Sequence, residues 1–223
     1  MKKVIVSDNG VITSNGKAHY IDALPDDFTE LQYISTAGKS ALDTGIVVQE
    51  TDTIIVTYEH TGTSGGTKDK FIIANKLPNT GGGIWFEVYN TAFTWYARFG
   101  GTGNNGSTSS ASTSSERTGV HTYEIRKGYF GIDGKKKITI SKYSSMPSAT
   151  LCVGGRLEGT NITGTTGNYV EVEVVDANGN LRWHGIPTKD SNNVAGLYDL
   201  VNDHFHTSDT SYPFTAGPVK TTT

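Results

Sequence analysis

The sequence predicts an all-β fold, an antiparallel β-sandwich preceded by a short N-terminal arm. Short apolar segments with period-two alternation recur along the chain, and tight-turn pairs such as Asn-Gly and Asp-Gly separate them. The 223 residues include 27 glycines and only 18% charged residues. Tyr, Val, Ile and Thr, which favour pleated sheets, are plentiful. Because a sandwich of about 200 residues is commonly one domain, we expect it to occupy residues 23–219, with a tail at 220–223.

The first 22 residues are typical of a hairpin-like arm. The segments 4–6 and 11–12 are strand-like, and Asn15-Gly16 is a strong tight-turn signal. An isolated hairpin is marginal in water, so residues 1–22 should not fold alone. We expect them to attach the sandwich to another chain or to sister subunits by strand pairing.

The globular part opens with strands at 28–34 and 53–59. In the second of these, Ile54, Val56 and Tyr58 share one face and polar residues dominate the other. This alternation predicts a strand with one face in the core.

The longest polar stretch covers residues 100–119 and has no apolar anchor beyond Ala111. We expect a mobile surface loop there. Shortening residues 102–118 should then change stability little, because loop-closure entropy varies slowly with length.

The second half of the chain supplies the remaining strands. They are expected at 121–126, 129–132, 137–141, 151–157, 169–175 and 181–186, with turns at 127–128, 133–134 and 178–179. Ile186-Pro187 should close the last strand, because proline has no N–H for a following ladder. The segment 194–200, with Leu197, Tyr198 and Leu200, should then close the core.

Six segments carry a resemblance to a known family. They are Leu-Pro at 24–25, Glu-Leu-Gln-Tyr-Ile at 30–34, Leu-Asp-Thr-Gly-Ile at 42–46, residues 128–135, Leu-Tyr-Asp-Leu-Val-Asn at 197–202 with Phe205, and residues 214–218. In this order they resemble the laminin-G-like, concanavalin A-like sandwich domains of phage and prophage virion proteins. The resemblance covers roughly residues 24–218.

This resemblance implies a jelly-roll sandwich and a non-enzymatic structural or decoration protein of a phage capsid or tail. Its partners would be other virion proteins, engaged through residues 1–22, and sister subunits or a host-surface glycan. Because the same fold hosts lectins and glycosidases, two alternatives stay open: a free bacterial carbohydrate-binding or adhesion module, and a glycoside hydrolase of the glucanase type. The family often carries a calcium ion at the rim, for which Asp52, Asp69 and Asp190 are available; no other cofactor is expected.

Charge, hydrophobic run lengths and cysteine count argue against several other classes of protein. The net charge of −3 gives no basic face for nucleic acid, and no apolar run reaches the length of a membrane span or of a signal peptide. We therefore expect a protein made in a cytoplasm that stays there or leaves by assembly into a particle or by lysis. The family resemblance implies the virion as its location, after synthesis in the host cytoplasm. The single cysteine, Cys152, excludes an internal disulfide and should be a small core residue.

Acidic residues at 171–176 resemble the Glu-x-Asp-x-x-Glu motif of glucanases. A retaining glycosidase needs two carboxyl groups about 5–5.5 Å apart, and residues two apart on a strand share a face. Here the middle position is Glu173 and the last is Asp176, which departs from the motif. The simpler interpretation places Val170, Val172 and Val174 in the core, Tyr169, Glu171 and Glu173 on the exposed face, and Asp176 in a turn. We therefore predict no catalytic residues.

An aromatic hairpin over residues 84–99 offers a candidate glycan site. Strand parity places Trp85, Tyr89, Tyr96 and Arg98 on the face opposite the apolar residues of the hairpin. Sugars stack on exposed aromatic faces, and polar side chains can bind their hydroxyl groups. The alternative is that these rings cover a second sheet or a subunit interface.

Two of the histidines form a weaker candidate for a metal site. His204 and His206 share a strand face beside Asp203 and Asp209. Because zinc usually needs three or four convergent ligands, we predict no metal site from this pair.

Overall fold

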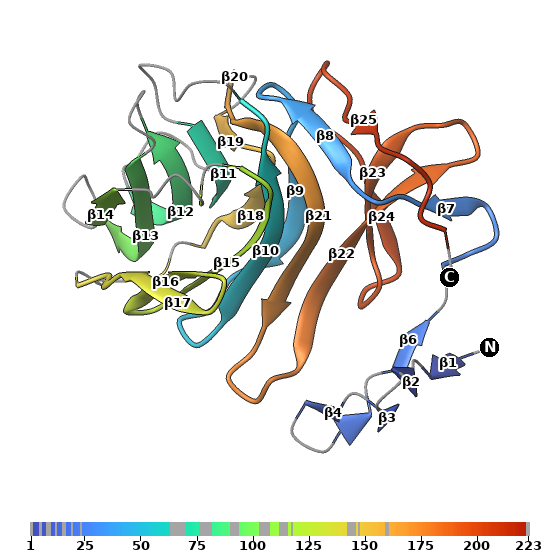
Figure 1. The fold of residues 1–223 in the computed structure, drawn as a ribbon, viewed down its shortest axis with the longest axis horizontal. Helices are drawn as coiled ribbons and strands as arrows, with labels where there is room; N and C mark the ends of the chain where they lie inside the picture. Colours follow the sequence, from blue (N-terminus) through green and yellow to red (C-terminus); the bar gives the residue numbers. More distant parts are fainter. Residues whose placement is uncertain are drawn as a thin grey trace.

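The computed structural model of the chain is a two-sheet antiparallel β-sandwich (Figure 1), which confirms the predicted fold class. It describes the backbone of residues 2–4, 6–7, 10–11, 13–14, 17–18, 20–22, 24–62, 70–75, 82–89, 94–102, 108–111, 116, 118–141, 146, 148–158 and 161–221. Within these ranges no helix has the length and apolar character that crossing a membrane requires.

The larger sheet is built around β10 (Thr53–His60) and β21 (Thr166–Val175), which pair along their whole length. Its main path runs through β17 (Lys135–Ile138), β16 (Tyr129–Ile132), β15 (Val120–Arg126), β10, β21, β22 (Leu181–Asp190), β23 (Ala195–Asp199) and β24 (His204–His206). Three short strands lie off this path: β7 (Phe28–Glu30) pairs with β22, β8 (Ile34–Ala37) with β21, and β25 (Thr215–Ala216) with β8.

The smaller sheet has six strands and faces the larger one. Its order is β14 (Thr108–Ala111), β13 (Thr94–Thr102), β12 (Gly82–Tyr89), β11 (Lys70–Asn75), β18 (Thr150–Val153) and β9 (Leu42–Val47). A short hairpin of β19 (Arg156–Glu158) and β20 (Asn161–Thr163) lies beside β11. In Figure 1 the green strands β12 to β14 form one end of this layer.

Aromatic rings from both sheets meet in the core. Phe86 on β12 stacks on Tyr123 of β15 with ring centres 5.4 Å apart, and Trp95 on β13 lies 5.2 Å from the same tyrosine. Phe130 of β16 completes the group. All four side chains are fully buried, so the rings tie the two layers together through the hydrophobic effect and through tilted and stacked contacts.

Several sequence predictions are confirmed by burial. Ile54, Val56 and Tyr58 are fully buried, as the alternation of the strand requires. Cys152 is buried beside Ala41 and Leu157. In the late stretch, Leu197 is fully buried and Tyr198 is 5% exposed, so this segment closes the core from the far end of the larger sheet.

The turn at Asp133-Gly134 is also where the sequence places it. The two residues join β16 to β17 and have φ angles of 50° and 72°. Positive φ at both central positions is typical of a type I′ turn, and its twist matches that of the flanking strands. The Asp-Gly pair therefore sets the register of this hairpin.

A β-bulge in β21 corrects the predicted parity of this strand. Thr57 pairs with Glu171 but its neighbour Tyr58 pairs with Tyr169, so Val170 is an extra residue. Such a bulge shifts alternation by one position. Tyr169 therefore lies in the core with no exposed area, and Val170 is only partly buried. The prediction of an exposed Tyr169 and a core Val170 was wrong, since strict alternation cannot show an inserted residue.

Pro187 does not end its strand as predicted. β22 continues to Asp190, and Pro187 lies where the strand exchanges β21 for β7 as its neighbour on one side. Its carbonyl accepts a hydrogen bond from the N–H of Leu31 at 2.8 Å. The missing N–H of proline therefore falls at a change of partner, where it interrupts no ladder.

The long polar stretch is partly structured. Thr108–Ala111 forms β14 and pairs with β13, so residues 108–111 are an edge strand where a loop was predicted. Glu116 is 8% exposed and forms an ion pair with Lys137. The other residues of the predicted loop at 103–107, 112–115 and 117 lie outside the described residues.

The N-terminal arm consists of three small strand pairs. β1 (Lys2–Val4) pairs with β6 (Tyr20–Asp22), β2 (Val6–Ser7) with β3 (Gly10–Val11), and β4 (Thr13–Ser14) with β5 (Lys17–Ala18). In the described part of the chain these strands pair only with one another, and Figure 1 draws them to one side of the sandwich. The sandwich sheets therefore close without a strand from the arm.

Two buried tyrosines give a test of the core. The Tyr169 hydroxyl donates to the Ile72 carbonyl at 2.6 Å, whereas the Tyr123 hydroxyl is buried with no hydrogen-bond partner among the described residues. Tyr169→Phe should lower the free energy of unfolding by about 1 kcal/mol because it removes a buried hydrogen bond. Tyr123→Phe, the matched control, should be neutral or stabilising because it removes an unsatisfied polar group. Urea denaturation of both variants measures the difference, and an equal loss in both would contradict the assigned hydrogen bond.

Candidate functional site

The β12–β13 hairpin presents two chemically different faces. Its inward face carries fully buried residues: Ile84, Phe86, Val88, Trp95, Ala97 and Phe99. On the outward face, Trp85 lies opposite Arg98 and Glu87 lies opposite Tyr96 in the strand register. The structure therefore brings together three of the four predicted glycan-binding residues, Trp85, Tyr96 and Arg98, on one surface. The side chain of Tyr89, the fourth, lies outside the described residues.

Burial divides this outward face into exposed rings and buried charges. Trp85 and Tyr96 are partly exposed, whereas Glu87 and Arg98 are each 4% exposed. The Arg98 guanidinium carbon lies 5.3 Å from the centre of the Trp85 ring. Burial lowers the pKa of Arg98, the nearby Arg156 lowers it further, and Glu87 opposes both effects. The Arg98 guanidinium thus lies over the Trp85 ring, and the charged groups of Glu87 and Arg98 lie beside the two rings on the same face.

Two further residues of this face were not found from the sequence. Phe71 on β11 packs edge-on against Trp85 with ring centres 5.6 Å apart, and the Arg156 guanidinium of β19 lies 5.6 Å from the Phe71 ring. They extend the surface across β11, which is separated from β19 by more than 80 positions in the chain. Only the pairing of β11 with β12 brings them to the hairpin, and no local pattern records that pairing.

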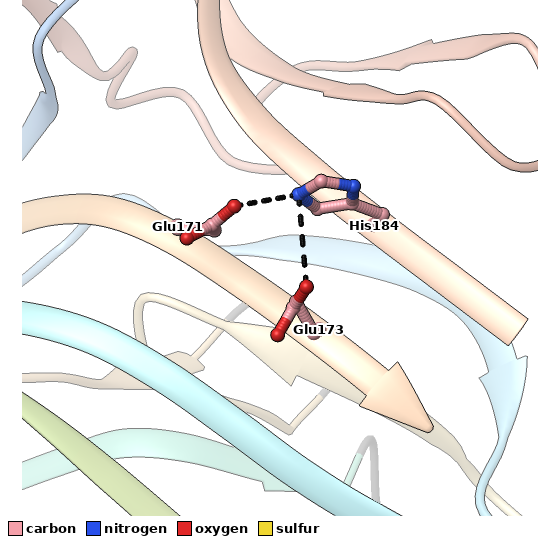
Figure 2. A group of neighbouring side chains, drawn as sticks. All are labelled: Glu171, Glu173 and His184. Carbon is pink, nitrogen blue, oxygen red and sulfur yellow. Dashed lines mark hydrogen bonds and ion pairs between the residues drawn. The ribbon is translucent and has the colours of Figure 1, made fainter. Parts of the chain in front are cut away.

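A second group lies on the outer face of the larger sheet. Glu171 and Glu173 on β21 point toward His184 on β22, and Figure 2 shows one imidazole nitrogen joined by dashed lines to an oxygen of each carboxylate. The His184 Nε2 atom lies 2.7 Å from a Glu171 carboxylate oxygen and 3.9 Å from a Glu173 oxygen. His184 is 6% exposed, whereas both glutamates are partly exposed.

Strand pairing explains why these three residues converge. Glu173 lies directly opposite His184 in the β21–β22 register, and Glu171 is its diagonal neighbour two residues away. The hydrogen bond with His184 holds the pKa of Glu171 below its usual range; burial opposes this shift, and the charges of His184 and Lys220 add to it. Glu171 is therefore a carboxylate at neutral pH.

Asp176 does not join this group. Its Oδ1 atom accepts hydrogen bonds from the backbone N–H groups of Asn178 and Asn180, each at 2.8 Å, and its Oδ2 atom accepts one from the Asn180 amide at 2.9 Å. Asp176 thus caps the hairpin turn, as the simpler interpretation of the sequence predicted. The glucanase motif is not assembled, since its third carboxylate belongs to the turn.

The histidines of β24 line a shallow pocket between the edges of the two sheets. The rings of His204 and His206 meet edge to face with centres 4.5 Å apart. Burial and the neighbouring His204 lower the pKa of His206. The pocket has a volume of about 370 Å³ and is lined by Asp43, Gly45, His204, Phe205, His206, Thr207 and Asp209. Asp203 is directed elsewhere and accepts a hydrogen bond from the Tyr198 hydroxyl.

The residues considered for a rim calcium ion have other partners. Asp52 is 1% exposed, forms an ion pair with Arg182 and accepts the Gln49 N–H at 2.7 Å. Asp190 accepts backbone N–H groups in the turn that follows it. Asp69 lies outside the described residues. Asp52 and Asp190 are thus engaged in separate contacts, and the rim calcium stays a prediction without an assigned position.

Comparisons with known proteins add little to this geometry. No protein-family model and no curated protein matches the chain. One similar solved structure is the Ruminococcus gnavus IT-sialidase CBM40, at 12% sequence identity and a TM-score of 0.47; the match covers 66% of this chain and 89% of that one. The proposed carbohydrate site therefore rests on the geometry of the β12–β13 hairpin.

The role of Asp176 can be tested through pH. Hydrogen bonds from Asn180 and Asn178 hold the pKa of Asp176 below its usual range, so its stabilising effect is present at neutral pH and is lost as pH falls through the lowered pKa. Asp176→Ala should therefore be less stable than the wild type at pH 7, and the difference should narrow in strongly acidic solution. Chemical denaturation at a series of pH values measures it. A difference that does not depend on pH would contradict the capping role.

Proposed function

We propose that this chain is a non-enzymatic β-sandwich module that binds carbohydrate on the outer face of its smaller sheet. The observation that carries the proposal is the pair of partly exposed rings, Trp85 and Tyr96, on adjacent strands beside the buried Glu87 and Arg98. Flat apolar rings offer stacking area for the C–H faces of a sugar, and neighbouring charged groups can select among its hydroxyl groups.

A role without catalysis agrees with the state of the acidic residues. A retaining glycosidase needs one carboxyl group with a raised pKa, so that it can act as an acid, beside a second that is ionised. Glu171 has a lowered pKa, which suits only the ionised group; Asp176, at the last position of the motif, also has a lowered pKa because the turn hydrogen bonds hold it, so no acid with a raised pKa is present in this pair. This arrangement favours the binding module over the glucanase alternative.

We further propose that the module belongs to a phage particle as a structural or decoration protein, attached through residues 1–22. Support for the particle comes from the resemblance of residues 24–218 to virion sandwich domains. Support for the arm comes from its strands, which in the described part of the chain pair only with one another. Detection of the chain by mass spectrometry in purified particles tests this role, and its absence from them would favour a free bacterial module.

Trp85→Ala tests the carbohydrate site. The variant should lose binding on a glycan array, because the substitution removes the larger of the two partly exposed rings. Its free energy of unfolding should stay close to that of the wild type. Tyr212→Ala is the matched control, since Tyr212 is an exposed ring elsewhere on the surface; it should bind like the wild type. Trp95→Ala should instead cost about 3–5 kcal/mol, as expected for a buried tryptophan. Unchanged binding by Trp85→Ala would contradict the proposed site.

Deletion of residues 1–22 tests the arm. The remaining chain should stay folded and monodisperse, with a melting temperature within a few degrees of the full chain, because no described sandwich strand pairs with the arm. It should no longer oligomerise or enter particles, as measured by light scattering and by incorporation assays. A deleted chain that fails to fold would make the arm part of the sandwich, and one that assembles normally would place the attachment surface elsewhere.

A further inference from the structure

We infer that Glu171, Glu173 and His184 form a binding site for a divalent transition-metal ion, with Zn²⁺ as the best match. One potential ligand atom from each side chain lies within 4.8 Å of the other two. No other group of three His, Cys, Asp or Glu side chains converges in this way within the described ranges. The site is separate from the Trp85–Tyr96 surface, because it lies on the outer face of the opposite sheet.

The separations fit the requirements of a small cation. Zinc binds imidazole nitrogen and carboxylate oxygen at about 2.0–2.2 Å, so tetrahedral ligand atoms lie about 3.3 Å from one another. The His184 Nε2 atom is 2.7 Å from a Glu171 oxygen and 3.9 Å from a Glu173 oxygen, values on either side of that separation. Small rotations of two partly exposed glutamate side chains would equalise them.

The charge pattern favours a cation at this position. Two carboxylates converge on one imidazole nitrogen, which can donate only one hydrogen bond, and the Glu173 contact is too long to be one. The neighbouring cation Lys220 pairs with Glu30 at 2.6 Å. A metal ion between the three groups would neutralise both carboxylates and bind the nitrogen lone pair at once.

The backbone positions of the three ligands are fixed, and one side of the site faces solvent. Glu173 and His184 are directly paired on two central strands, and the backbone N–H of His184 donates a 3.0 Å hydrogen bond to the Asp199 side chain. His184 is almost fully buried, so its ring loses little further freedom on binding. The Glu171 side chain is 43% exposed, so a metal ion can enter from solvent. Three protein ligands leave at least one coordination position for water or for an external ligand.

The mixture of ligands narrows the choice of metal. Imidazole suits zinc, copper, iron and nickel, whereas calcium and magnesium prefer oxygen ligands alone. A site with one nitrogen and two carboxylate oxygens should therefore bind Zn²⁺ much more tightly than Ca²⁺ or Mg²⁺. Affinity should fall in acid, because protons compete for the ligand atoms.

Isothermal titration of the full chain with ZnCl₂ tests this inference. We expect one Zn²⁺ per chain at this site, and at least tenfold weaker binding in Glu171→Gln and in Glu173→Gln, which preserve side-chain size. Glu124→Gln is the matched control, since Glu124 lies on the same outer face across β10, three pairings from His184; it should bind like the wild type. His204→Ala should also leave the affinity unchanged.

The possible results distinguish Zn²⁺ binding at this site from diffuse binding to acidic residues and from binding in the β24 pocket. No heat above background at millimolar Zn²⁺ would overturn the inference. Equal weakening by Glu124→Gln would mean diffuse attraction to acidic residues and would overturn it as well. Loss of binding in His204→Ala, with Glu171→Gln unchanged, would move the metal to the β24 pocket. Circular dichroism of each variant checks the fold. The test uses the two glutamine variants because a substitution of the buried His184, such as His184→Ala, can prevent folding.

Discussion

The register of β21 is the constraint on which the rest of the structure depends. This strand pairs with β10 on one side and with β8 and then β22 on the other. Its register therefore decides which side chains of these neighbouring strands lie beside its core residues and which lie beside its outward residues. The bulge at Val170 lets Tyr169 enter the core, where its hydroxyl reaches the opposite sheet at Ile72, while Glu171 and Glu173 stay outside. Without the extra residue, either the tyrosine or the two glutamates would lie on the wrong face.

The two outer faces of the sandwich differ in chemistry although they are built in the same way. The smaller sheet carries rings and guanidinium groups around Trp85, and the larger sheet carries two carboxylates around His184. In both places a buried polar residue is fixed by strand pairing, and partly exposed residues beside it face solvent. The core between the sheets holds aromatic and aliphatic side chains, so packing uses one face of these strands and the two proposed binding sites use the other.

Much of this could be predicted from the sequence, because alternation and turn residues act locally. The face of Ile54, Val56 and Tyr58, the outward position of Trp85 and Tyr96, and the turn role of Asp176 all follow from period two and from turn chemistry. The bulge at Val170 could not be predicted, since an extra residue leaves no mark in composition. His184 was not identified from the sequence as a partner of Glu173, although pairing symmetric about Asn178-Gly179 places the two opposite each other. Phe71 and Arg156 depend on long-range pairing that no local signal encodes.

A nuclear Overhauser spectrum of the wild-type protein tests the register of β21 most directly. The structure places the Tyr169 and Tyr58 rings with centres 4.7 Å apart, so strong cross-peaks should join their ring protons. The Tyr169 signals should also resist broadening by a soluble paramagnetic agent, because the ring is fully buried. Tyr169 signals that broaden readily and show no contact with Tyr58 would place this ring on the outer face. That result would remove the bulge, and with it the present placement of Glu171 and Glu173.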